Sequence, residues 1–237
     1  MADLFQTTRW SLVVAISGDR EPAQQALAQL CEAYWRPVYA YIRCQGFDPD
    51  KAADLTQAFF VHLLEHQSLQ KADASRGRFR AYLVTCARNF LTNARERDLT
   101  LRRGAGIPHE SIDAIEADRP LRVLAADANS SPEAVFERHW ALNVVDRALE
   151  RLRASYASRG QEKVFDALRP FLTSDVPVDS HRVDSDMDQV SGAASRAALH
   201  RLRHRFGDAL RAEVQDTISD SAQVESELRH LLNMLSG

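Results

Sequence analysis

The chain has little of what sheet proteins and exported proteins depend on. Its 237 residues include only nine glycines and eight prolines, which is few for the many tight turns of a β-sandwich or β-barrel. No run of 18 apolar residues occurs, so no membrane-spanning helix is expected. The first residues lack the small-residue cleavage site of a signal peptide. The sequence therefore predicts a soluble, mainly helical protein with no membrane partner.

Cysteine is equally scarce. The three cysteines, Cys31, Cys44 and Cys86, lie far apart, and each is inside an apolar helical pattern. Such spacing fits neither a disulfide framework nor a zinc site with closely paired ligands. We therefore expect reduced thiols, no bound cofactor or metal, and a cytoplasmic location.

Motifs for catalysis are also few. We find no glycine-rich phosphate loop and no Ser/His/Asp or Cys/His arrangement in a motif context, so an enzyme is not expected. One short stretch, "HLLEH" from His62 to His66, has the H-x-x-E-H spacing of inverted zinc peptidases. An amphipathic helix produces such a match by chance, and no third ligand is evident. A zinc peptidase is kept as an alternative of a different class, which a metal analysis would test.

Helical periodicity organises the first hundred residues. Apolar residues recur at helical spacing between residues 21 and 46, with Pro37 expected to kink the helix. The stretch "DPDKAADLTQAFFVHLLEH" begins with a helix-start signal and continues as an amphipathic helix. A third helix is predicted over 75–98. These elements make residues 1–100 a helical domain.

The rest of the chain is predicted to be helical after an interruption. Residues 101–130 lose the periodicity and collect glycine, proline, aspartate and serine, which indicates a linker. A Ser-Pro-Glu start then opens a helix with a strong apolar stripe, and the chain ends in a short amphipathic helix. We predict an all-α fold with two helical domains, residues 1–100 and 131–237, joined by the linker.

Positive charge is concentrated in two places. The net charge is −3, yet residues 71–103 hold nine basic and three acidic residues, a local charge of +6. A solvated helix face is the ordinary interpretation of such a run, but here the charges are not balanced by acids at i,i+4. Aromatic and amide side chains lie among the arginines and could stack on and bond to bases. We therefore predict that the helix 75–98 binds nucleic acid, and a second basic run occupies 195–206.

The order of segments resembles a known family. "YWRPVYAYIRCQG", "AADLTQAFFVHLLE", "GRFRAYLVTCARNFLTNARER" and "AALHRLRHRF" together resemble the extracytoplasmic-function (ECF) sigma factors of bacterial RNA polymerase, within the sigma-70 family. The resemblance covers nearly the whole chain. It implies a promoter-recognition subunit with a region 2-like first domain and a region 4-like second domain that carries a helix-turn-helix. The implied partners are core RNA polymerase and promoter DNA, with an anti-sigma factor or a Ser/Thr kinase as a candidate regulator.

The resemblance also implies roles for residues of the first domain. By themselves, Asp54 and Gln57 are equally consistent with a helix-start signature and with a polar patch that docks on a protein partner. In the family this segment docks on core polymerase. Thr56 is the nearest acceptor for a kinase. Family members melt the promoter −10 element and hold a flipped base beside the basic helix, which assigns Asn89 to that base. The full set implied for the −10 element is Arg78, Arg80, Tyr82, Arg88, Asn89, Asn93, Arg95 and Arg97.

The second domain departs from the family pattern. The residues implied for the −35 element are Ser191, Ser195, Arg196, His200, Arg201, Arg203 and Arg205. The helix that should support them places Asp184 and Asp188 where leucines are expected, and burial of two carboxylates there would be prohibitive. A one-residue shift gives only a narrow apolar stripe. Two functions therefore stay open: a sigma factor with an altered −35 contact, or a polymerase-binding transcription modulator with degenerate −35 recognition.

Overall fold

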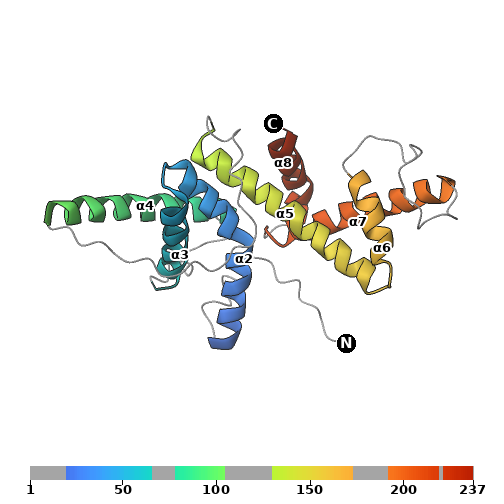
Figure 1. The fold of residues 1–237 in the computed structure, drawn as a ribbon, viewed down its shortest axis with the longest axis horizontal. Coiled ribbons are helices and arrows are strands. Elements are labelled where there is room, and N and C mark those ends of the chain that lie inside the picture. Colours follow the sequence, from blue (N-terminus) through green and yellow to red (C-terminus); the bar gives the residue numbers. More distant parts are fainter. Residues whose placement is uncertain (1–19, 66–77, 105–129, 173–191, 219–220, 237) are drawn as a thin grey trace.

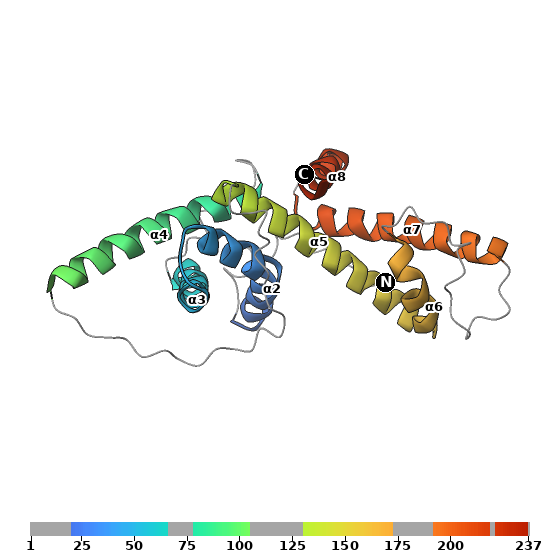
Figure 2. The same ribbon diagram turned by 45° about the horizontal axis from the view of Figure 1, so that its top comes forward.

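Every element in the described part of the chain is a helix or a helical turn. The computed structural model describes residues 20–65, 78–104, 130–172, 192–218 and 221–236, and these ranges confirm the predicted all-α fold (Figures 1 and 2). None of the helices in these ranges is long and apolar enough to cross a membrane. The elements are α2 (Arg20–Cys44), α3 (Pro49–Glu65), α4 (Phe79–Gly104), α5 (Pro132–Ala157), α6 (Glu162–Leu168), η4 (Arg169–Phe171), α7 (Gly192–Gln215), η5 (Ser221–Gln223) and α8 (Val224–Ser236).

Local capping groups start two of these helices where the sequence predicts them. The Asp48 carboxylate accepts a hydrogen bond of 2.8 Å from the backbone N–H of Lys51 in the first turn of α3. The Ser131 hydroxyl accepts one of 3.2 Å from the N–H of Ala134, and Pro132 follows it at the first position of α5. Each bond satisfies a backbone donor that has no partner within its helix. The predicted starts at Asp-Pro and Ser-Pro-Glu therefore have a direct physical cause.

The basic helix is longer than the sequence predicts. The expected range was 75–98, whereas α4 runs from Phe79 to Gly104 and includes the first four residues of the predicted linker. Residues 105–129 lie outside the described residues. The helical stretch past residue 98 is rich in leucine and arginine, both good helix formers, and Gly104 coincides with its end.

Two clusters of buried side chains form the core. The first draws on α2, α3, α4, α5, α7 and α8, and its largest buried side chains include Tyr34, Phe59 and Trp140. The second lies between α5, α6 and α7, around Phe165 and Leu202. Helix α5 contributes to both clusters and packs on α2 and α7, and Figure 2 shows it running through the middle of the molecule. The two predicted helical modules are therefore in direct contact through α5.

Pro37 bends α2 and leaves one acceptor for another helix. The proline lies inside α2, and Figure 1 shows that helix bent along its length. Because proline has no N–H, the carbonyl of Ala33, four residues earlier, receives no bond from within the helix. The side-chain amide of Asn143 on α5 donates a hydrogen bond of 2.5 Å to this carbonyl. The kink and the contact between α2 and α5 therefore have one shared origin.

Replacing Asn143 by alanine is expected to lower the free energy of unfolding by about 1–2 kcal/mol, since the buried carbonyl of Ala33 would be left without a donor. Chemical denaturation followed by circular dichroism measures the change. The control is Asn233→Ala on the exposed side of α8, which should change the free energy by less than about 0.5 kcal/mol. Equal stability of the two variants would contradict a role for this bond.

Candidate nucleic-acid and partner interfaces

Helix α4 presents a polar strip to solvent. One side of the helix is buried in the first core through Phe79, Leu83 and Leu91. The opposite side carries cationic, amide and hydroxyl groups at helical spacing, as the sequence predicts for a strip that contacts nucleic acid. The exposed side chains on this side are Thr85, Arg88, Asn89, Thr92, Asn93, Arg95 and Glu96, and Arg97 is also exposed, one turn after Asn93.

Two members of the predicted −10 set at this strip are fixed by neighbours. The Arg95 guanidinium donates to the Gln45 side chain at 3.2 Å and lies 5.3 Å from the centre of the Phe47 ring. Tyr82 is half-buried, its ring is 6.3 Å from that of Phe79, and burial raises the pKa of its hydroxyl. Both residues are therefore held against the protein at the margin of the strip.

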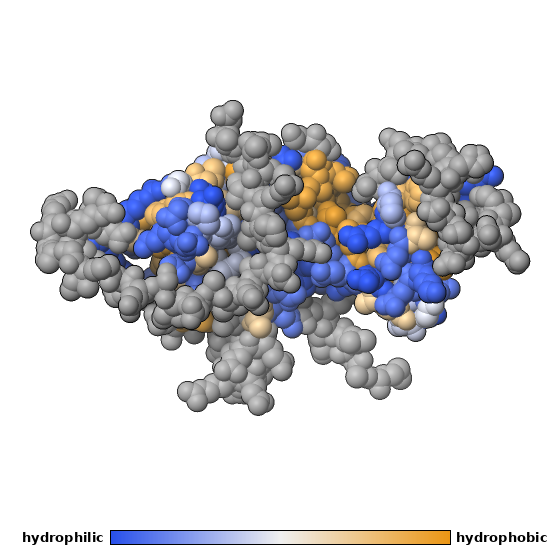
Figure 3. All heavy atoms as spheres, in the orientation of Figure 1, coloured by the Kyte–Doolittle hydropathy of each residue, from blue (hydrophilic) through white to orange (hydrophobic). Residues whose placement is uncertain are grey.

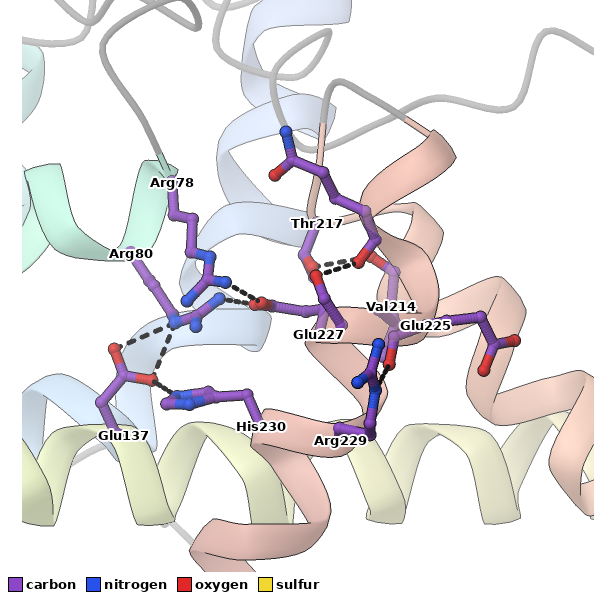
Figure 4. A network of polar contacts seen from close by, with 11 residues as sticks. Arg78, Arg80, Glu137, Val214, Thr217, Glu225, Glu227, Arg229 and His230 are labelled. Carbon is purple, nitrogen blue, oxygen red and sulfur yellow. Dashed lines mark hydrogen bonds and ion pairs between the residues drawn. The ribbon is translucent and has the colours of Figure 1, made fainter.

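The first turn of α4 is engaged by acidic residues of the second half of the chain. Arg80 is 3% exposed; its Nε donates to both oxygens of Glu137 on α5, at 2.9 and 2.8 Å, and its NH1 pairs with Glu227 on α8. Arg78 pairs with the same Glu227 at 2.8 Å. Figure 4 shows both arginines converging on Glu227, with His230 against Glu137.

The surroundings of Arg80 are those of a buried cation. Its guanidinium carbon lies 4.1 Å from the centre of the Trp140 ring, a favourable contact for a desolvated charge. Burial lowers the pKa of Arg80 and the Glu137 carboxylate opposes that shift. In this arrangement Arg80 faces protein carboxylates, so its predicted contact with DNA requires that both Glu227 of α8 and Glu137 of α5 first release it.

Sequence reasoning missed the acidic partners, although one signal was present. Glu227 occupies a position within the apolar stripe of α8, between Val224 and Leu228 and one turn before the buried Leu231. A carboxylate in such a stripe is costly unless a cation meets it. The position of Glu227 in an apolar stripe could have predicted a buried ion pair. It could not have predicted which cation forms the pair.

Helix α3 carries a second exposed stripe. Asp54, Gln57 and Val61 are exposed at i, i+3 and i+7, on the opposite side from the buried Phe59 and Leu63. Val61 is 45% exposed and lies on the same side of the helix as the two polar residues. The structure thus adds Val61 to the predicted docking pair, and its spacing from Asp54 was visible in the sequence.

Thr56 lies on the buried side of the same helix. Its side chain is fully buried, and its hydroxyl donates a hydrogen bond of 2.7 Å to the carbonyl of Ala52. A kinase could reach this hydroxyl only after α3 opened locally.

Helix α7 divides its basic residues between solvent and protein. Arg196, His200, Arg201 and Arg203 are exposed. Arg203 donates to the carbonyl of Phe171 at 2.9 Å, and the guanidinium of Arg205 lies 5.3 Å from the Tyr156 ring. The other face of the helix enters the second core.

Part of the predicted −35 set lies outside this description. Ser195 is in the first turn of α7, and its side chain is not described. Ser191 and the acidic segment 183–190 lie outside the described residues, so the predicted supporting helix is not described either.

Potential metal ligands and thiols are dispersed in the described ranges. The His62 ring lies 5.4 Å from the Phe90 ring, and His66 is outside those ranges. Within them, no three His, Cys, Asp or Glu side chains are grouped as a metal site would require. The three cysteines are free thiols, and burial raises the pKa of Cys31 to about 11, which keeps this thiol protonated and poorly nucleophilic at neutral pH.

Comparison with protein families finds a similarity in the first half of the chain. Residues 30–98 match the family model of sigma-70 region 2, a range that includes most of α2, all of α3 and the exposed strip of α4. This segment is therefore similar to sigma-70 region 2. Comparisons with curated proteins and with solved structures give no match. Sigma-70 region 2 implies binding to core RNA polymerase and to promoter DNA, and it supports a general role as an RNA polymerase sigma factor.

Proposed function

We propose that the chain is a cytoplasmic RNA polymerase sigma factor of the ECF type, without catalytic activity of its own. It directs core polymerase to specific promoters and assists in melting the −10 element. The observation that carries this proposal is the exposed polar strip on α4, which lies within the sigma-70 region 2 match.

The strip has the groups needed to hold a separated DNA strand. The amides of Asn89 and Asn93 can each donate to and accept from a base edge, and the exposed Arg88 and Arg97 supply positive charge for phosphates. Extruding a base from a duplex costs a few kcal/mol. Contacts with the single strand along this strip offset that cost, which is how binding favours the melted form.

The α3 stripe is the proposed contact with core polymerase. Asp54 and Gln57 offer a charged and a polar group, and Val61 adds apolar area beside them. An apolar residue next to polar groups on one exposed face is the composition of a protein interface. An anti-sigma factor that covered this stripe, or a kinase acting on Thr56 after local opening, would regulate the same step.

The polymerase-binding modulator is the second candidate. It is favoured by the intramolecular contacts of Arg203 and Arg205, which tie two described residues of the predicted −35 set to the protein. A factor whose −35 arginines were engaged in this way could bind polymerase while it recognised the −35 element poorly.

Replacing Asn89 by alanine is expected to reduce initiation at the factor's own start sites by at least tenfold. A well-placed amide contact with a base is worth about 1–3 kcal/mol. The measurement is transcription in vitro with core RNA polymerase on a pool of random promoters. The matched control is Gln161→Ala, which removes an exposed amide at the start of α6 and should leave the start sites unchanged.

The same assay separates the two candidates. A sigma factor gives defined start sites that weaken with Asn89→Ala. Core binding by the wild-type chain without initiation at any promoter would instead favour the modulator. Failure to bind core polymerase would contradict both.

A further inference from the structure

Two of the arginines implied for the −10 element are already paired with carboxylates of the same chain. Arg78 and Arg80 open the basic helix, and both pair with Glu227 of α8. Arg80 also donates through its Nε to both oxygens of Glu137. Guanidinium N–H groups of the kind used here also donate to phosphate oxygens. The carboxylates of Glu227 and Glu137 therefore bind these arginines at the start of the helix, where phosphate oxygens of DNA would otherwise bind.

This contact is built into the core. Glu227 and Arg80 are both almost fully buried, with 1% and 3% of their side chains exposed, and Leu231 of α8 is buried in the first core one turn farther along. A buried carboxylate that lost its cations would be strongly unfavourable. A DNA strand cannot reach Arg80 while α8 is docked, because Glu227, Glu137 and the Trp140 ring surround the guanidinium.

We propose that α8 is an intramolecular cover for the DNA-binding helix, with Glu227 occupying the position of a backbone phosphate of the −10 strand. The cover must leave before Arg78 and Arg80 can contact DNA. The proposal rests on the function proposed above, and it gives the free factor a lower affinity for DNA than its exposed strip alone would have. It also explains why a carboxylate lies in the apolar stripe of α8.

The released helix has a measurable property. Helix α8 has 13 residues, a length that is marginal for an isolated helix in water, so α8 should lose much of its helix once it leaves the core. Figure 3 shows hydrophobic residues gathered over α8 even in the docked state, and Leu232 is 55% exposed. Hydrogen exchange of the α8 amides therefore reports directly on undocking.

The test uses the full chain with three substitutions. Glu227→Gln removes the charge that pairs with both arginines. Leu231→Ala loosens α8 without any change of charge. Glu225→Gln is the control, because Glu225 lies on the same helix but pairs with Arg211 of α7 at 3.1 Å. The measurement is fluorescence anisotropy with a labelled random-sequence single-stranded oligonucleotide over a range of salt concentrations, with α8 hydrogen exchange and core polymerase binding recorded for each protein.

The expected result is a shared change in the first two variants. Both should bind the oligonucleotide about tenfold more tightly, because a larger fraction of molecules is open. The slope of log K against log salt should steepen by about 0.7, since Arg78 gains a phosphate contact while Glu137 of α5 still holds Arg80. Their α8 amides should exchange faster. The affinity of Glu225→Gln for the oligonucleotide should stay within twofold of the wild-type value.

Three other outcomes would overturn the proposal. If Glu227→Gln and Glu225→Gln bind the oligonucleotide with equal affinity while all proteins bind core polymerase, α8 does not cover the DNA-binding helix and the proposed function stands. If Glu227→Gln binds the oligonucleotide more tightly and a folded Leu231→Ala does not, the loss of negative charge alone explains the tighter binding and undocking of α8 does not. If no variant binds either core polymerase or the oligonucleotide, the proposed function fails together with the cover.

Discussion

Replacing Arg80 by methionine is expected to lower the free energy of unfolding by about 3–5 kcal/mol, the range for breaking one side of a buried ion pair. The substitution leaves Glu227 buried with Arg78 as its remaining cation, and it removes the charge that lies 4.1 Å from the Trp140 ring. Chemical denaturation followed by circular dichroism gives the value. Adding Glu227→Leu to the same chain should recover part of the loss, because the uncompensated carboxylate is then gone.

The control for this prediction is Arg97→Met, since Arg97 is an exposed arginine of the same helix. It should change the free energy of unfolding by less than about 0.5 kcal/mol. An Arg80→Met protein with wild-type stability and weakened DNA binding would mean that Arg80 points to solvent in the free protein.

Reversing the charge of Asp54 with lysine is expected to weaken binding to core RNA polymerase at least about 30-fold, or about 2 kcal/mol. Asp54 is exposed in the stripe with Gln57 and Val61, so a positive charge there would face whatever cation the partner offers. Competition binding against the wild-type chain measures the loss, and the folded state should be preserved because the position is exposed.

Asp166→Lys is the matched control for the docking prediction. Asp166 is exposed on α6, outside the sigma-70 region 2 match, so the same charge reversal should leave the affinity for core polymerase within about twofold. Equal losses in the two variants would indicate a long-range electrostatic effect of net charge and not a docking stripe on α3.

The features that could be predicted from the sequence have local causes. The starts of α3 and α5 depend on Asp48 and Ser131, each within three residues of the N–H that it accepts. The exposed strip of α4 follows from helical periodicity, since the buried and polar positions of one helix repeat over a few residues. The order of such local segments also carries the resemblance, and the match over residues 30–98 supports its sigma-70 region 2 part.

What could not be predicted depends on pairs that are distant in the chain. Arg80 meets Glu137 across 57 residues and Glu227 across 147, and no local pattern links them. From composition, an arginine in a basic helix indicates a DNA contact; only the packing of α8 shows that this one is buried against protein. Helix α4 also ends six residues beyond the predicted end, because the leucines and arginines after residue 98 favour a helix.

The hydrogen bond between Asn143 and the Ala33 carbonyl has a consequence for how two helices stay aligned. Helices with apolar seams can pack in several staggers that differ by about one turn, 5.4 Å, at similar hydrophobic gain. Only one stagger brings the amide of Asn143 to the single carbonyl that Pro37 leaves open. The hydrogen bond therefore fixes the register of α5 on α2, in the way that one buried asparagine selects the alignment of a coiled coil. Sliding α5 along α2 by a turn would leave a donor and an acceptor buried and unbonded at once.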